Sequence, residues 1–435
     1  MRPSSESSRA TLRLNDICTA IVDCEHKTAS EGDGYALSVG TRAMKQGRLV
    51  IDACKPVSEE TYINWSRRMV PVEGDLVLAR EAPVGQVIRV PRWPRICLGQ
   101  RTVLIRANTA RVHPRFLHYW LLGPDAQGPM AEQAGGATVA HLNVDDIRRL
   151  DVSKLPQDRK HQRAVAETLG AIDDLIENNR RRVELLEEMA RVIYREWFVH
   201  FRYPSNNEKA ALIESPLGLL PEDWAARKVG KVARLVRGRS YRTTELVKSG
   251  GLPFVNLKCM MRGGGFRRDG LKRYAGTYSA DQCVRTGDIV LAVTDLTQGR
   301  EILARATLVP PLEEDAVISL DVVRLVPSRD DDRLWLFAAL FWSDFADRVK
   351  EYANGSTVLH LAPVHITECL LPWPSAAIRT RFIATLRPII SSIDVLNSTS
   401  EMLAAKRDLL LPKLVTGQIN VSQMNPDSLV KDLVP

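Results

Sequence analysis

Two short stretches in the N-terminal part of the chain carry side chains suited to contact with a nucleic acid. His26, Lys27 and Thr28 follow a strand-like run, and Gln100 and Arg101 stand just before a predicted strand. Arginine and glutamine can form paired hydrogen bonds with the edges of guanine and adenine, respectively. We therefore predict that these five residues contact DNA.

A denser group of basic residues lies between positions 237 and 273. Glycine, serine and threonine are interleaved with them, and such loops can approach a phosphate backbone closely. For any single residue, solubilising surface charge is the commoner explanation, and it is the density of the group that favours nucleic-acid binding. The candidates are Arg237, Arg239, Arg242, Thr243, Lys258, Arg262, Arg267, Arg268, Lys272 and Arg273.

Catalytic signatures are missing from the sequence. It has no G-x-x-x-x-G-K-[ST] phosphate loop, no H-E-x-x-H zinc motif and no glycine fingerprint for a dinucleotide or adenosylmethionine. Asn425-Pro426 is followed by Asp427 and Ser428, not by the aromatic residues with which an amino-methyltransferase holds a flipped base. We predict no catalytic residue, no metal ion and no cofactor in this chain.

Composition points to a basic protein of the cytoplasm. The chain has 435 residues, enough for two or more domains, and a formal charge of +8, which makes an anionic partner plausible. The seven cysteines contain no C-x-x-C pair, which argues against a zinc site or a disulfide framework and fits a reducing compartment. The first residues lack the apolar core of a signal peptide, and residues 334–342, the longest apolar run, are too few to span a membrane. We expect no membrane partner.

Two heptad patterns predict the long helices that must position these loops. Apolar residues in 162–198 are spaced alternately by four and three, which keeps one stripe of a helix facing a partner helix. The second pattern repeats the first 217 residues later, from Val165 to Phe382 and from Trp197 to Leu414. The predicted seam consists of Val165, Leu169, Ile172, Ile176, Asn179, Val183, Leu186 and Ile193 in the first helix, and of Phe382, Leu386, Ile389, Ile393, Leu396, Leu403, Leu410 and Leu414 in the second.

Polar residues interrupt this seam. Asn179 lies in the first helix, and Ser400 and Arg407 lie in the second. A buried asparagine can fix the register of paired helices at a cost in stability. Alternatively these positions are half-exposed or face another protein, and the sequence leaves both interpretations open. Pro388 predicts a local kink in the second helix.

The segments around the helices are also repeated. Residues 74–79 match residues 287–292, and residues 102–105 match residues 322–325 as predicted strands. The motif T-V-x-H-L places His141 and His360 at matching positions. A pair of DNA-facing histidines is one explanation, but a structural role is favoured because the flanking apolar residues recur as well.

We therefore predict an α/β (α+β) fold with an internal repeat, in which two globular domains alternate with two long helices that pair antiparallel as an intramolecular coiled coil with pseudo-twofold symmetry. The predicted parts are a first domain over 1–157, a long helix in 158–200, a second domain over 201–374, a second long helix in 375–418 and a flexible tail over 419–435.

Several segments resemble the specificity (S) subunits of type I restriction–modification systems. Residues 407–419 (RDLLLPKLVTGQI) resemble the C-terminal repeat of that family, and residues 194–201 (YREWFVHF) resemble its central repeat. Residues 23–28 (DCEHKT) and 218–224 (GLLPEDW) resemble the openings of its two target-recognition domains. The resemblance covers nearly the whole chain.

This resemblance implies a noncatalytic DNA reader whose domains each bind one half of a bipartite, asymmetric target in double-stranded DNA. The helices would set the spacing between the halves and dock two methyltransferase (M) subunits, which restriction (R) subunits join. S-adenosylmethionine, ATP and Mg²⁺ would be bound by those partners. A helix of about 50 Å corresponds to about 15 base pairs of DNA.

Two other functions remain open from the residues alone. One is a DNA-modifying enzyme with an unrecognised active site. The other is a coiled-coil adaptor that binds protein rather than DNA, which the clustered basic loops make the weakest of the three.

Overall fold

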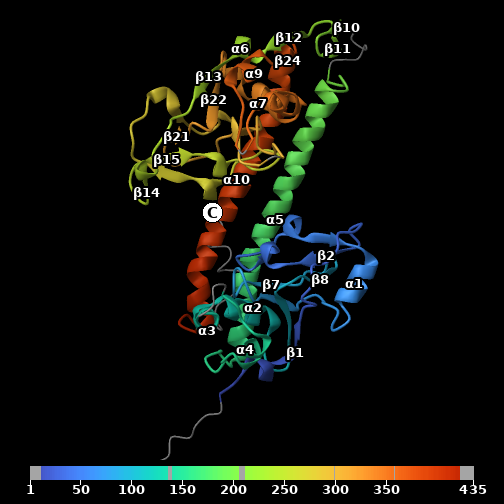
Figure 1. Ribbon diagram of the computed structural model, residues 1–435, viewed down its shortest axis with the longest axis vertical. Helices are drawn as coiled ribbons and strands as arrows, with labels where there is room; N and C mark the ends of the chain where they lie inside the picture. The colour runs from blue at the N-terminus through green and yellow to red at the C-terminus, as the bar shows by residue number, and fades with distance from the viewer. Residues whose placement is uncertain (1–10, 136–139, 205–210, 298, 357, 422–435) are drawn as a thin grey trace, which may run out of the picture. The chain divides into compact units, whose positions relative to one another are not determined.

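A computed structural model describes residues 11–135, 140–204, 211–297, 299–356 and 358–421 (Figure 1). The chain divides into two compact units, unit 1 with residues 1–179 and 399–435, and unit 2 with residues 180–398. Each unit combines helices with strands, so the predicted mixed fold class is confirmed. The five-part division predicted from the sequence stays a prediction, and most of the predicted tail, from residue 422 onward, lies outside the described residues.

Two helices of 40 residues each are present where the heptads predict them, α5 (Arg159–Phe198) and α10 (Ala376–Val415) (Figure 1). Each contributes one part to unit 1 and the other part to unit 2. Helix α10 is continuous through Pro388, whose carbonyl accepts a hydrogen bond from Ser392 Oγ at 2.8 Å. No helix in the described ranges is both long and apolar enough to cross a bilayer.

Unit 1 is built on a four-stranded antiparallel sheet in the order β1 (Cys18–Asp23), β9 (Thr102–Ala107), β6 (Leu76–Ala79) and β7 (Val87–Arg89). A second sheet has the order β5 (Lys55–Val57), β2 (Ala36–Val39) and β8 (Ile96–Leu98), and β3 (Met44–Lys45) pairs with β4 (Arg48–Leu49). The helices are α1 (Glu59–Trp65), α2 (Pro114–Leu122), α3 (Pro124–Gln133), α4 (Val144–Arg149) and the short 3-10 helices η1 (Leu14–Ile17), η2 (Thr41–Ala43) and η3 (Ile51–Ala53).

Unit 2 repeats this plan. Its antiparallel sheet has the order β13 (Ala233–Arg237), β22 (Val322–Pro327), β18 (Ile289–Ala292) and β20 (Ala306–Leu308). Its second sheet has the order β14 (Leu246–Val247), β16 (Lys272–Tyr274), β15 (Leu252–Val255), β21 (Ala316–Ile318) and β17 (Cys283–Val284). Three strand pairs accompany them, β10 (Leu212–Ser215) with β11 (Gly218–Pro221), β12 (Ala225–Lys228) with β24 (Leu370–Trp373), and β19 (Thr294–Asp295) with β23 (Leu359–His360).

The helices of unit 2 are short apart from its shares of α5 and α10. They are α6 (Val229–Val232), α7 (Arg333–Phe341), α8 (Phe345–Val349), α9 (Pro363–Glu368), and the 3-10 helices η4 (Thr243–Glu245), η5 (Leu257–Cys259), η6 (Arg268–Gly270), η7 (Ala280–Gln282), η8 (Asp330–Asp332) and η9 (Lys350–Tyr352).

Strands β6 and β18 are apolar at every position because both faces of each main sheet are covered there. In β6, Leu76 and Leu78 pack into one core cluster, and Val77 and Ala79 pack into another. In unit 2, the residues of β18 divide between two clusters in the same alternating way. This double burial explains why residues 74–79 and 287–292 match so closely in the sequence.

The long helices run antiparallel within unit 1. Val165 and Leu169 of α5 share a buried cluster with Leu414 of α10, and a ring nitrogen of His161 lies 3.0 Å from the Leu414 carbonyl oxygen. Further along α5, Ile172 and Ile176 pack with Leu403 of α10. Residue numbers therefore increase along α5 in the direction in which they decrease along α10.

In unit 2 the end of α5 packs on the beginning of α10. Phe382 is fully buried among aromatic rings, and its ring centroid lies 4.8 Å from that of Phe198, 5.8 Å from that of Trp197 and 6.2 Å from that of Tyr194. The equivalent site of unit 1 has Val165 against Leu414 and Val415, all buried. The predicted repeat of the two helices is thus visible in their packing.

The predicted seam residues are buried or half-buried. Buried members are Val165, Leu169, Ile172, Ile176, Asn179, Phe382, Leu386, Ile389, Leu396, Leu403 and Leu414, and half-buried members are Val183, Leu186, Ile193, Ile393 and Leu410. Ser400 is half-buried, whereas Arg407 is buried and its Nη1 donates to Asp173 Oδ1 at 2.8 Å. The charge of Arg407 is therefore paired inside unit 1.

Candidate nucleic-acid interface

A tight turn at Gln100 and Arg101 connects β8 to β9 in unit 1. Arg101 has a positive φ of 67°, which side chains other than glycine rarely adopt. Its carbonyl accepts a hydrogen bond from Arg80 N at 2.8 Å, and the Arg80 carbonyl accepts one from Leu142 N at 3.0 Å. The residues that follow β6 and those that precede α4 are thereby fixed against this turn.

The Arg80 side chain connects the end of β6 with two other segments, the end of β1 and the residues before α4. Only 7% of it is exposed. Its Nη1 donates to Asp23 Oδ1 at 2.8 Å, and its Nε donates to the Leu142 carbonyl at 2.8 Å. Its Nη2 lies 2.9 Å from His141 Nε2. Because arginine has only donors, His141 Nε2 must be the acceptor in this contact.

The same network continues to Arg101. Since His141 Nε2 accepts, its Nδ1 carries the proton and donates to Glu81 Oε1 at 2.7 Å. Glu81 Oε2 in turn lies 2.9 Å from Arg101 Nε, and the Arg101 side chain is 53% exposed. A chain of polar contacts therefore runs from buried Arg80 to a guanidinium that reaches solvent.

The sequence favours a structural role for His141, either capping the following helix or satisfying the preceding loop. Asn143, not His141, is the N-cap residue of α4. His141 instead connects Arg80 with Glu81, so its contacts are those of a residue that fixes loops.

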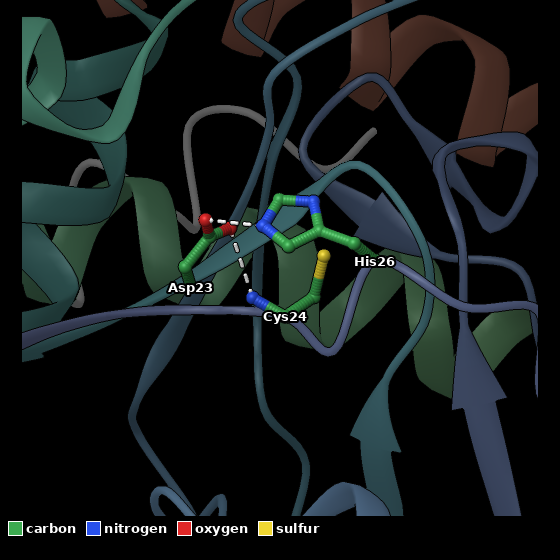
Figure 2. Close-up of side chains that lie close together, drawn as sticks. All are labelled: Asp23, Cys24 and His26. Atoms are coloured by element: carbon green, nitrogen blue, oxygen red, sulfur yellow. Dashed lines mark hydrogen bonds and ion pairs between the residues drawn. The ribbon is translucent and has the colours of Figure 1, made fainter.

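Figure 2 shows the loop after β1, where the ring of His26 is directed at the Asp23 carboxylate. His26 Nε2 lies 2.7 Å from Asp23 Oδ2, and Cys24 N donates to Asp23 Oδ1 at 2.9 Å. Gln100 Nε2 donates to the His26 carbonyl at 3.0 Å, which ties this loop to the turn. Of the predicted residues, His26, Gln100 and Arg101 thus lie together, with Lys27 and Thr28 exposed beside them.

Asp23, Cys24 and His26 present donor atoms within 4.8 Å of one another, the spacing of a metal site. Both Asp23 oxygens, however, already accept hydrogen bonds from Arg80 Nη1, at 2.8 and 3.1 Å. A metal ion would have to replace this arginine, whose positive charge would repel it. The arrangement is better suited to holding a loop than to binding a metal.

Unit 2 has the corresponding turn at Leu320 and Asp321, which connects β21 to β22. The Asp321 carbonyl accepts from Val293 N at 2.9 Å, and the Val293 carbonyl accepts from Leu361 N at 2.8 Å. The side chains around it are different, because Val293 stands where unit 1 has Arg80. His360 Nδ1 contacts only Thr294 Oγ1 in the described part of the chain, at 3.4 Å.

The basic candidates of unit 2 divide into two groups. Arg237 is exposed at the end of β13, and Arg239 follows it, with backbone hydrogen bonds to Ile318 O and from Leu320 N at 2.8 Å each. These two arginines lie beside the turn at 320–321. The backbone N–H of Arg242 donates to Glu245 at the start of η4, and Thr243 and Lys258 are exposed.

The other candidates lie in β16 or in the segment that precedes it, and three of them are paired with acids. Arg262 lies 2.9 Å from Glu301, Arg267 lies 2.6 Å from Asp269, and Arg273 lies 2.7 Å from Glu314. Arg268 and Lys272 are half-buried. Their density in the sequence therefore overstates the charge that they present to a partner.

Arg80, Glu81 and Asp321 are not among the site residues predicted from the sequence. Arg80 and Glu81 directly follow the strand at residues 74–79, and Asp321 directly precedes the strand at residues 322–325. The internal repeat could have identified Asp321, because aligning residues 102–105 with residues 322–325 places Arg101 opposite Asp321.

No protein-family model matches the chain. It is 22% identical over 387 residues to the type I restriction enzyme MjaIX specificity subunit of Methanocaldococcus jannaschii, covering 85% of this chain and 82% of that protein. It is 31% identical over 133 residues to a putative type I restriction enzyme MjaX specificity subunit from the same organism, covering 30% of this chain and 29% of that protein.

Among solved structures, the S subunit of the type I restriction–modification system from M. genitalium matches with a TM-score of 0.54 at 14% identity, covering 95% of this chain and 99% of that one. At this identity the match shows a shared fold. Together with the two relatives it confirms the resemblance to type I specificity subunits that the sequence indicated.

Proposed function

We propose that this chain is the DNA-specificity subunit of a type I restriction–modification complex, and that units 1 and 2 each bind one half of a bipartite DNA target. The observation that carries the proposal is the repeated backbone arrangement, in which turns 100–101 and 320–321 have matching hydrogen bonds but different side chains. Two DNA-binding units with the same backbone arrangement but different contact residues would recognise two different half-sites, which is what an asymmetric target requires. The relatives named as specificity subunits support the same function.

The turns carry side chains whose chemistry suits base edges. Arg101, Gln100, Arg237 and Arg239 offer the donors that recognise guanine and adenine in the major groove, and Lys27 and Lys258 can contact phosphates. In this function α5 and α10 set the distance between the half-sites and dock two methyltransferase subunits, which restriction subunits join. Adenosylmethionine, ATP and Mg²⁺ belong to those partners, and the complex acts in the cytoplasm.

The function is tested by coexpressing the chain with its methyltransferase partner and mapping methylated bases in genomic DNA by long-read sequencing. We expect a split motif with two specified halves and an unspecified spacer. A continuous short motif would refute the assignment of one half-site to each unit.

The purified chain alone tests the alternative of a DNA-modifying enzyme. Incubated with DNA, Mg²⁺ and adenosylmethionine, it should neither cleave nor methylate. Either activity would show that the chain has a catalytic site of its own.

The role of the helices as a spacer is tested by inserting four residues into α5 at the junction between residues 179 and 180 and four into α10 between residues 398 and 399. Four residues add about 6 Å of helix, or about two base pairs. The unspecified spacer should lengthen while both specified halves stay the same. Altered half-sites would contradict the spacer role.

A further inference from the structure

The turns at 100–101 and 320–321 can be compared residue by residue. In both, the carbonyl of the second turn residue accepts from the residue that follows the central strand, Arg80 or Val293. In both, the first residue after the outer strand donates a backbone hydrogen bond to the first residue of the neighbouring strand. In unit 1 Cys24 N donates to the Thr102 carbonyl of β9, and in unit 2 Gly238 N donates to the Val322 carbonyl of β22, at 3.2 Å each. Arg101 and Asp321 therefore occupy equivalent backbone positions.

The charges at this equivalent site are reversed. Unit 1 has the cation Arg101 in the turn, and unit 2 has the anion Asp321. At the end of the neighbouring strand, Asp23 is paired with Val103, and Arg237 is paired with Val323 in the same register. Cation and anion have thus changed places between two turns whose backbone hydrogen bonds and strand register match, although Arg101 has a positive φ of 67° and Asp321 does not.

Among the residues that the structure describes, Asp321 makes no side-chain contact that would explain its charge. Elsewhere in unit 2, a carboxylate that stabilises a turn accepts from a backbone N–H, as Asp288 Oδ2 does from Arg285 N at 2.9 Å. Within the described residues, no N–H donates to the Asp321 carboxylate and no cation lies within 4 Å of it. Its side chain is half-buried, and its negative charge, after burial, contributes to the raised pKa of the Tyr241 hydroxyl.

An unpaired carboxylate is costly on a surface that meets DNA, because phosphates repel it. A carboxylate can nevertheless read a base, since it accepts a hydrogen bond from the exocyclic amino group of cytosine. Arginine does the opposite and donates to the O6 and N7 acceptors of guanine. The reversed charges therefore correspond to bases of opposite hydrogen-bonding character.

We propose that Arg101 and Asp321 are equivalent specificity-determining residues, Arg101 contacting a guanine in the half-site of unit 1 and Asp321 contacting the amino group of a cytosine in the half-site of unit 2. This inference rests on the proposed function of the chain as a DNA reader. Glu81 Oε2 positions Arg101 by contacting its Nε at 2.9 Å. About half of the Arg101 side chain remains exposed to solvent.

The experiment uses the full chain in complex with its methyltransferase subunit. D321N removes the charge at constant shape, and R101Q shortens the donor. E313Q and R92Q are the matched controls, because Glu313 and Arg92 are exposed charged residues of the same units outside the two turns. Methylation is mapped on genomic DNA, and binding is measured on duplexes that carry each single base substitution of the wild-type motif.

We expect D321N to lose discrimination by about 10- to 100-fold at one base pair of one half-site, and R101Q to do so at one base pair of the other. The controls should retain the wild-type motif. Unchanged motifs in D321N and R101Q, changes in the same half-site, or loss of preference for a base other than the cytosine or guanine assigned here would overturn the inference. If the wild-type complex methylates no bipartite motif, the proposed function itself is wrong.

A variant that misfolds is recognised by hydrogen exchange of its β9 or β22 peptides. In that case D321E and R101K replace the first variants, because they keep the charge and change the reach of the contact. They should shift the same single positions, and wild-type discrimination in both would count against the assignment.

Discussion

Replacing Arg80 with methionine is the sharpest test of how unit 1 positions its turn. Methionine fills a similar volume but cannot donate hydrogen bonds. The Arg80 side chain makes contacts to Asp23, His141 and the Leu142 carbonyl, all between 2.8 and 3.1 Å. R80M removes all of them at once and leaves the Asp23 carboxylate, whose side chain is 20% exposed, without its arginine.

The expected cost follows from this geometry. Breaking a fully buried ion pair costs about 3–5 kcal/mol, because the remaining charge is left without compensation. Asp23 retains hydrogen bonds from Cys24 N and His26 and some contact with water, so about 2–4 kcal/mol is the appropriate range for unit 1. R149M is the matched control, since Arg149 pairs with Asp146 on an exposed helix surface, where such pairs contribute about 0–1 kcal/mol.

The assay is hydrogen exchange with mass spectrometry over a urea series, because a chain with two units need not unfold in a single step. Peptides from β1 and β9 report on unit 1, and peptides from β13 and β22 report on unit 2. R80M should lower the opening free energy of the first set and leave the second unchanged. D23N in the R80M background should recover part of the loss, because it removes the unpaired charge.

Two results would show that Arg80 does not stabilise unit 1 through Asp23. One is an R80M variant that is no less stable than R149M. The other is a D23N substitution that costs as much in the R80M background as in the wild type, which would show that the two side chains are not coupled.

Three further predictions concern other parts of the fold. F382A should lower the stability of unit 2 by about 3–5 kcal/mol in the same exchange assay, because Phe382 is fully buried against Phe198 and other rings; a loss below about 1 kcal/mol would contradict the packing. Burial lowers the pKa of His118 to about 4 from its ordinary value of 6.5. Unit 1 should therefore keep its full stability above pH 6.5 and lose about 2–3 kcal/mol of it as the pH falls to 4. H118Q should abolish this pH dependence of stability, and an equal dependence in H118Q would contradict the prediction. G238A should destabilise the edge of unit 2 by at least about 2 kcal/mol, since an added Cβ would lie 2.0 Å from the Ser319 carbonyl oxygen; G128A, with open space around the added atom, is the control and should change stability far less.

Local patterns in the sequence were sufficient for the long elements. Heptad spacing predicted α5 and α10 to within a few residues at each end, because apolar spacing directly reports which face of a helix is buried. Continuous apolar runs predicted β6 and β18 for the same reason, since both of their faces are covered. The repeat between the two halves was equally visible, because the packing that it preserves requires the same residue types.

The candidate interface was only partly predictable. His26, Gln100 and Arg101 were selected as polar residues near strand ends, and the structure brings them together. Several arginines of the group 237–273 were selected for their density, yet Arg262, Arg267 and Arg273 are paired with acids of their own unit. Which acid lies near which base depends on strand order, and strand order is not a local property.

Sequence patterns were enough to place the two long helices and to reveal the repeat between the two halves of the chain, because the buried face of a helix or strand requires apolar residues at a fixed spacing. The contacts of the turns at 100–101 and 320–321 became visible in the folded chain alone, because they join segments far apart in the sequence. Arg80 meets Asp23, 57 residues away, and His141, 61 residues away, through contacts that no local pattern encodes. The equivalence of Arg101 and Asp321 likewise follows from matching hydrogen bonds between strands that are distant in the sequence, and the residues around either turn do not reveal it.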